Sequence, residues 1–177
     1  MRFSLGICLI LTAHLFLSPT QHADGILMKA AGRGDLKKVQ RLLGNGARVN
    51  GRDSGGKTAL HFAAQSKNVL VVDVLVRAGA DVNAKADGDV TPLMLSVDMG
   101  FGDPEIALRL IRAGADVQAA DTNGDTALII ATTESSLDVV KALLEKGANP
   151  NAKGLHGETA LNYGGHECND RPCEAST

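Results

Sequence analysis

The sequence predicts an all-α protein: a solenoid of stacked helix-turn-helix units with β-hairpin-like finger loops. Two short motifs that recur with one common period carry this prediction. The first is Thr-Ala-Leu or Thr-Pro-Leu, and its threonines stand 33, 35 and 33 residues apart, at Thr58, Thr91, Thr126 and Thr159. The second opens with Gly-Ala and keeps step with the first, at Gly46, Gly79, Gly114 and Gly147. Motifs locked at a period near 33 residues define a stacked repeat array.

A shortage of large aromatic side chains agrees with thin layers of helices. Of the 177 residues 44% are hydrophobic, yet the chain has only four Phe, one Tyr and no Trp. The core must therefore be built from Leu, Val, Ile and Ala, which suits a repeat array better than a globule. The repeats fill nearly all of the chain after its N-terminal part, so no second domain is expected.

The N-terminal residues 1–23 have the pattern of a signal peptide. Arg2 precedes an apolar run over residues 3–17, and a polar stretch follows as far as Ala23. This run is shorter than the roughly 20 residues that a membrane-spanning helix needs. We therefore expect an exported protein, periplasmic or secreted, whose mature form has no membrane association. The residues before Ala23 depart from the usual small-x-small cleavage pattern, which leaves the cleavage site, and an uncleaved anchor, open.

Each element of the unit over residues 53–85 has a local cause. The turn formers at residues 53–56 should make the tip of a finger loop. Thr58 should cap a short first helix, because its hydroxyl can accept a hydrogen bond from an unpaired amide of the first turn. A second helix with valines and a leucine on one face follows, and Gly79 should end it in a left-handed conformation.

The other units repeat this plan with local departures. The predicted divisions are a signal peptide at 1–23, an N-terminal capping unit at 24–52, full units at 53–85, 86–120 and 121–153, and a partial C-terminal unit with a tail at 154–177. The unit 86–120 has two extra residues in the turn that contains Phe101, which is either an exposed contact residue or folded back onto the helices. In the last unit Gly164 and Gly165 replace the usual alanine pair and should weaken its helix.

This unit resembles the ankyrin repeat, whose hallmark is Thr-Pro-Leu-His followed by Ala-Ala, with Gly-Ala-Asp-Val-Asn after the second helix. Thr58-Ala59-Leu60-His61 and Gly79-Ala80-Asp81-Val82-Asn83 carry the resemblance here. It implies a protein that binds another protein through a concave groove. It also implies a structural role for His61, as a hydrogen-bond partner of the neighbouring repeat's backbone. As an exported protein the chain is similar to the small periplasmic ankyrin proteins of bacteria, which hold, inhibit or protect a partner.

The resemblance places the partner-binding residues on the finger loops and on the exposed side of the first helices. By position these are Ser54, Lys57, Gln65 and Ser66 in the second unit, Asp87, Val90, Asp98, Met99 and Phe101 in the third, Thr122, Asp125, Thr133 and Glu134 in the fourth, and Leu155, His156 and Glu158 in the fifth. Most of the charged members after the second unit are acidic. The sequence therefore predicts a groove that is acidic towards its C-terminal end, and a partner with a basic segment.

The distribution of charge along the chain supports that expectation. Residues 24–85 hold eleven Lys or Arg against five Asp or Glu, whereas residues 86–177 hold six against fifteen. The basic end is either a solvated face or a surface for an acidic partner. With an acidic far half and no aromatic residues among the basic ones, nucleic acid is not an expected partner.

The C-terminal cysteines leave three alternatives open. Cys168 and Cys173 can form a disulfide in an oxidising compartment, which we favour, or remain free thiols. They could also join His166 in a metal site, but three ligands without a fourth at a recognised spacing make a weak case. A metal-binding or enzymatic function of this His/Cys cluster is thus one alternative to protein binding, and a secreted effector that acts on host proteins is another.

No set of residues outside the repeat pattern predicts catalysis. Residues 51–58 match the phosphate-binding pattern G-x-x-x-x-G-K-[ST], but that loop needs a buried strand before it and a long helix after it. Here Thr58 is only the threonine that recurs in each unit. We therefore expect a non-enzymatic, monomeric protein without a cofactor, and the partner's identity is not encoded in any motif.

Overall fold

The computed structural model describes residues 19–98, 103–133 and 137–162, and over these it forms four helix pairs with no β-strand, only an isolated antiparallel bridge between Ala120 and Thr126. The pairs are α1 (Pro19–Gly32) with α2 (Leu36–Gly44), α3 (Ala59–Ala64) with α4 (Val69–Arg77), α5 (Pro92–Val97) with α6 (Pro104–Arg112), and α7 (Ala127–Thr133) with α8 (Leu137–Glu145). Two short 3-10 turns lie in finger loops, η1 (Asp87–Asp89) and η2 (Leu155–Gly157).

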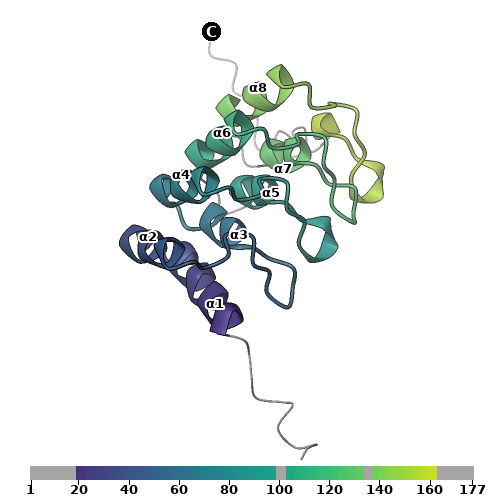
Figure 1. The fold of residues 1–177 in the computed structure, drawn as a ribbon. Helices are drawn as coiled ribbons and strands as arrows, with labels where there is room; N and C mark the ends of the chain where they lie inside the picture. Colours follow the sequence, from purple (N-terminus) through teal and green to yellow (C-terminus); the bar gives the residue numbers. More distant parts are fainter. Residues whose placement is uncertain (1–18, 99–102, 134–136, 163–177) are drawn as a thin grey trace, which may run out of the picture.

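The helices stack in two rows, and the finger loops project from one side (Figure 1). The first helices of the units pack in the order α1, α3, α5, α7, and the second helices in the order α2, α4, α6, α8. Each unit thus contacts its neighbours along the stack, as in a repeat solenoid. The predicted fold class, an all-α stack of helix pairs, is confirmed.

The recurrent threonines stand where the sequence predicts, directly before the first helices. Thr91 accepts a hydrogen bond from the Met94 N–H through its hydroxyl (3.4 Å), and Thr126 does the same for Ile129 (3.3 Å). Gly79 follows α4 with a φ of +85°. Only glycine takes this conformation at little cost, so the chain turns from helix to loop at each Gly-Ala motif.

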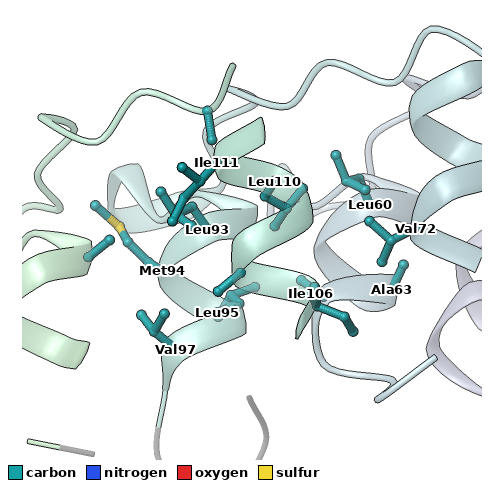
Figure 2. Close-up of a cluster of buried hydrophobic side chains, with 14 of the residues drawn as sticks. Leu60, Ala63, Val72, Leu93, Met94, Leu95, Val97, Ile106, Leu110 and Ile111 are labelled. Carbon is teal, nitrogen blue, oxygen red and sulfur yellow. The ribbon is translucent and has the colours of Figure 1, made fainter. Parts of the chain in front are cut away.

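The core is a thin layer of aliphatic side chains between the two rows. The leucines of the first three recurrent motifs are almost fully buried, at 0% exposure for Leu60, 1% for Leu93 and 2% for Leu128. On the second helices Val72 and Ile106 are also buried, and they pack with these leucines into one cluster (Figure 2). Alanines such as Ala63 let neighbouring helices approach closely, which explains how so few aromatic residues suffice.

A ladder of side-chain amides ties each Gly-Ala motif to the next along the outer edge. In each step an Asn or Gln amide nitrogen donates to a glycine carbonyl, and its oxygen accepts from the backbone N–H two residues beyond that glycine. The steps join Asn50 to Gly79 and Asp81, Asn83 to Gly114 and Asp116, and Gln118 to Gly147 and Asn149. One side chain thereby satisfies two backbone groups of the neighbouring unit.

A buried carboxylate closes the N-terminal end of the stack. Asp24, 3% exposed on α1, accepts hydrogen bonds from the backbone N–H of Arg48 (2.9 Å) and from its guanidinium (2.6 and 2.8 Å). Gly51 passes so close that a methyl group there would lie 2.8 Å from the Asp24 carboxyl carbon. Helix α1 begins at Pro19, ahead of the predicted boundary at residue 23, while residues 1–18 lie outside the described part, so the signal peptide stays a prediction.

Candidate protein-binding surface

The finger loops are built on aspartates that fold the chain back on itself. In the first of them the Asp53 carboxylate accepts hydrogen bonds from the backbone N–H of Gly55 (2.9 Å) and of Lys57 (2.8 Å). The Asp53 N–H in turn donates to the Lys57 carbonyl at 3.0 Å. Asp121 repeats the pattern in the fourth unit, where it binds the Asn123 and Asp125 amides. Such turns hold a loop rigid without a strand on either side.

Backbone hydrogen bonds join successive finger tips into one row. The Asp87 N–H donates to the Gly55 carbonyl oxygen, and the Thr122 N–H donates to the Gly88 carbonyl oxygen, both at 2.9 Å. Arg52 adds a guanidinium bond to the Lys85 carbonyl oxygen at 2.5 Å. The loops of the second, third and fourth units therefore have fixed positions relative to one another.

Equivalent positions at the tips carry four different side chains. They are Ser54, Asp87, Thr122 and Leu155, spaced 33, 35 and 33 residues apart, and all four are exposed. Leu155 is an apolar residue in this row and is 45% exposed. The structure thus brings these predicted residues together on one edge of the molecule.

At the base of the fingers the predicted residues are half-buried, and several already contact other groups of this chain. Lys57 holds its ammonium 5.9 Å from the centre of the Phe62 ring, within reach of a cation–π interaction. Asp125 accepts a hydrogen bond from the Leu155 N–H (3.3 Å), and Glu158, at the equivalent position of the fifth unit, is half-buried. The Val90 carbonyl oxygen is bound by the neighbouring unit, as described below for His61.

The turn residues after the first helices are less available than the sequence suggests. Gln65 is the half-buried C-cap of α3. The Ser66 hydroxyl donates to the Ala63 carbonyl oxygen (2.8 Å) and accepts from the Asn68 N–H (3.3 Å), so it shapes the turn. Asp98 is half-buried at the end of α5.

Several predictions fall on residues outside the described part. These are Met99, Phe101 and Glu134, the side chains of Thr133 and His156, and the cysteines Cys168 and Cys173 with His166. Their roles, including the disulfide and the metal site, stay predictions. Among the residues that the structure describes, no group of three or more His, Cys, Asp or Glu is placed to hold a metal ion.

The sequence-based set omits two kinds of residue near the fingers. Phe62 and Ile130 occupy equivalent positions on α3 and α7 and are half-buried, so they add apolar area beside the polar fingers. Arg52, Lys85 and Lys153 recur at the base of three fingers and are exposed. These three cations offset the acidic residues of the row, and their spacing of one or more repeat periods was the signal that could have found them.

His61 has a structural role, as the resemblance implies. It is 0% exposed, its Nδ1 accepts from the Thr58 backbone N–H (3.1 Å), and its Nε2 lies 3.1 Å from the Val90 carbonyl oxygen. This geometry requires a neutral ring with its proton on Nε2, which donates to Val90. Burial lowers the pKa of His61 below its ordinary value of 6.5, and the bond to Val90 opposes this only in part.

The phosphate-loop pattern at residues 51–58 belongs to the finger. The Lys57 side chain lies over the Phe62 ring, Thr58 precedes the six-residue helix α3, and no strand leads into the loop. Within the described ranges, no helix has the length and apolar character that crossing a bilayer would require.

The fold and the site together define a helix-pair repeat protein that presents a row of linked loops. A family model described as "Ankyrin repeats (3 copies)" matches residues 12–86 and 93–169. The chain therefore belongs to the ankyrin repeat family. Proteins of this family mediate protein–protein interaction.

Three relatives show how widely this array is reused. The mitochondrial disaggregase of Bos taurus is 35% identical over 170 residues, which are 92% of this chain and 24% of the relative. Ankyrin repeat and SOCS box protein 6 of Homo sapiens is 35% identical over 145 residues, 76% of this chain and 34% of the relative. An L-asparaginase of Dirofilaria immitis is 33% identical over 123 residues, 68% of this chain and 20% of the relative.

The chain thus spans at most 34% of the length of these relatives. All three come from animals, so they give no support to the bacterial periplasmic type that the sequence suggested. These matches neither support nor contradict export. The L-asparaginase match is partial and assigns no activity to the array.

Proposed function

We propose that this chain is a non-catalytic binding module that holds and modulates, or protects, a partner protein along its finger loops and first helices. The observation that carries the proposal is the hydrogen-bonded row of finger tips, with Asp87 bound to Gly55 and Thr122 bound to Gly88. A backbone fixed in this way presents varied side chains without an ordering cost when a partner binds.

The partner surface should carry a basic segment facing the third and fourth units. Asp87 is exposed at the tip, and Asp125 is half-exposed at the base of the next finger. The excess of fifteen acidic over six basic residues after position 85 points the same way. Because Arg52, Lys85 and Lys153 lie at the bases of the fingers, the acidic contact should be local to the Asp87 tip and to Asp125, where it mainly speeds encounter.

Charge reversal at the tip tests this proposal. The full-length protein and its Asp87→Lys variant are used as bait for exported proteins, and capture is compared at low and high salt. We expect the variant to lose most of the salt-sensitive capture. Asp138→Lys is the matched control, since Asp138 is exposed on α8 and lies away from the fingers. Equal capture by the two variants would reject the finger surface.

We also infer that the chain acts after export. The apolar run and the polar stretch over residues 1–23 support this. N-terminal sequencing of the protein from separated cell fractions tests it, with a start near residue 24 in the exported fraction as the expected result. A full-length chain that stays inside would reject export.

The metal-binding or enzymatic alternative depends on His156, His166, Cys168 and Cys173, whose side chains lie outside the described part. Metal analysis of the purified protein decides it, because that alternative requires stoichiometric zinc or copper. The host-effector alternative depends on where the protein acts, so the fractionation above bears on it directly.

A further inference from the structure

The C-terminal end of the stack exposes two leucines whose equivalents in the immediately preceding unit are buried. Leu161 is 83% exposed, while the leucines at the same position of the three preceding units, Leu60, Leu93 and Leu128, are at most 2% exposed. On α8, Leu144 is 45% exposed, whereas the equivalent Ile111 on α6 is 4% exposed. In the earlier units the next layer of helices covers these positions.

These leucines border an apolar groove. It has a volume of about 420 Å³ and is lined by Leu128, Thr132, Val140, Leu144, Pro150, Ala160 and Leu161. Its walls come from α7, α8 and the start of the fifth unit, which together form the end face of the stack. We call this surface the end groove.

Residues 170–177, which lie one repeat period after α8, lack the apolar pattern of the second helices. One period after α8 come residues 170–177, where Pro172 and Ser176 replace the buried Val139 and Leu143 of α8. No Leu, Ile, Val, Met or Phe occurs among residues 170–177. These eight residues therefore do not carry the apolar stripe with which the other second helices pack.

The packing of α8 against α6 indicates what kind of element fits the end groove. Helix α6 packs against α8, and Ala107 and Ile111 on α6 are buried at 0% and 4% exposure. Val140 and Leu144 occupy the same positions on α8, one period later. The surface that receives a helix in the third unit is therefore repeated on α8, and among the residues that the structure describes no further second helix packs against it.

We propose that the end groove binds an amphipathic helix of another protein, which stacks on α8 as α8 stacks on α6. The partner helix carries two aliphatic residues four positions apart, like Val139 and Leu143, because this is the pair that α8 itself buries in the stack. This surface is separate from the finger loops. It gives the chain a second binding surface, and this proposal does not depend on the proposed binding of a partner at the fingers.

A labelled peptide with the sequence of residues 137–146, held helical by a side-chain staple, serves as the probe. Its fluorescence anisotropy is measured with the full-length protein and with Leu144→Asp and Leu161→Asp. We expect saturable binding to the unchanged protein and at least about tenfold weaker binding to both variants. Leu70→Asp is the matched control, because Leu70 is 59% exposed on α4 in the second unit. That variant should bind the probe as the unchanged protein does.

Circular dichroism checks that the variants are folded, which we expect because the replaced side chains are exposed. A peptide with aspartates in place of Val139 and Leu143 should not bind. The proposal is overturned if the unchanged protein does not bind the probe, if Leu144→Asp binds it equally well, or if Asp87→Lys abolishes binding, which would place the probe on the fingers. It is also overturned if sedimentation shows a dimer that Leu144→Asp converts to a monomer, because a second copy would then occupy the end groove.

Discussion

His61 shows how one buried polar side chain can join two units. Its ring satisfies the amide of Thr58 within its own unit and the carbonyl of Val90 in the next. The equivalent position of the third unit carries Met94, whose sulfur lies 3.5 Å from the Thr91 N–H. Methionine thus replaces the bond within the unit but provides no donor for the bond between units.

The lowered pKa of His61 predicts a loss of stability in acid. Above its ordinary value of 6.5 the ring is neutral in both the folded and the unfolded chain. As the pH falls below 6.5 the unfolded chain takes up the proton first, so the free energy of unfolding decreases until the pH passes the lower pKa of the folded state. Urea unfolding at a series of pH values measures this.

His61→Met is the matched variant for that experiment, because the chain itself uses methionine at this position of the third unit. At neutral pH it should lower the free energy of unfolding by about 1–2 kcal/mol, since the Val90 carbonyl loses its partner. The decrease just below pH 6.5 should become shallower. An unchanged pH dependence would show that another group causes it.

Gly51 is required by close packing against Asp24. A Cβ atom at residue 51 would meet the carboxyl group of Asp24 at 2.8 Å, and that carboxyl group is buried and bound to Arg48. We expect Gly51→Ala to lower the free energy of unfolding by about 1–3 kcal/mol. Gly25→Ala on α1 is the control, since nothing lies within 4 Å of a Cβ there and alanine favours the helix. Equal stability of both variants would contradict the packing argument.

At the level of the elements, the amide ladder sets the spacing between units. Asn83 uses both ends of its amide, donating to the Gly114 carbonyl (3.4 Å) and accepting from the Asp116 N–H (2.7 Å). We expect Asn83→Ala to lower the free energy of unfolding by about 1 kcal/mol, although the side chain is exposed. Chemical denaturation measures the change.

Asn123→Ala is the control for the ladder. Asn123 is also an exposed asparagine, but its side chain bonds only to Asp121 within its own finger, at 3.4 Å. The Asn123→Ala substitution should change the free energy of unfolding much less than Asn83→Ala does. If both variants were equally stable, the ladder would be a consequence of stacking and not a cause of it.

The helices were predictable because their signals are local and repeated. The threonines before the first helices and the glycines after the second ones act through backbone conformation within a few residues, so the sequence specifies them. The finger row was harder to predict, because its bonds from Asp87 to Gly55 and from Thr122 to Gly88 join backbone groups of different units. No side-chain pattern encodes such a bond.

The positions of the candidate binding residues were predictable from the sequence. Whether their polar groups are free to bind a partner was less predictable. Ser54, Asp87 and Thr122 are exposed at the tips as expected. Ser66 was included because of its place after the first helix, yet its hydroxyl is used by the turn. Whether a polar side chain is free for a partner depends on short-range geometry, which spacing along the chain does not report.

On the scale of the whole molecule, the two ends of the stack differ in how they are closed. The N-terminal end has polar helix faces and the buried bond between Asp24 and Arg48. The C-terminal end has the exposed Leu144 and Leu161 around the end groove. In a linear array stability depends on contacts with neighbouring units, so an open end should unfold locally before the centre does.

Hydrogen exchange can detect this difference directly. We expect the amides of α8 to exchange faster than those of α4 and α6, which are packed on both sides by other second helices. Mass spectrometry of peptides from the exchanged protein gives the rates. Equal protection of α8 and α4 would mean that the end of the array is as well supported as its middle.

The amide ladder also records how the chain tolerates a change of length. The step from Asn83 to Asp116 covers 33 residues, while the steps from Asn50 to Asp81 and from Gln118 to Asn149 cover 31, yet all three make the same pair of bonds. The two additional residues therefore leave the bonds between neighbouring units unaltered. A foreign segment inserted between Asp98 and Asp103 should likewise leave these bonds intact, which makes this position a practical handle for engineering.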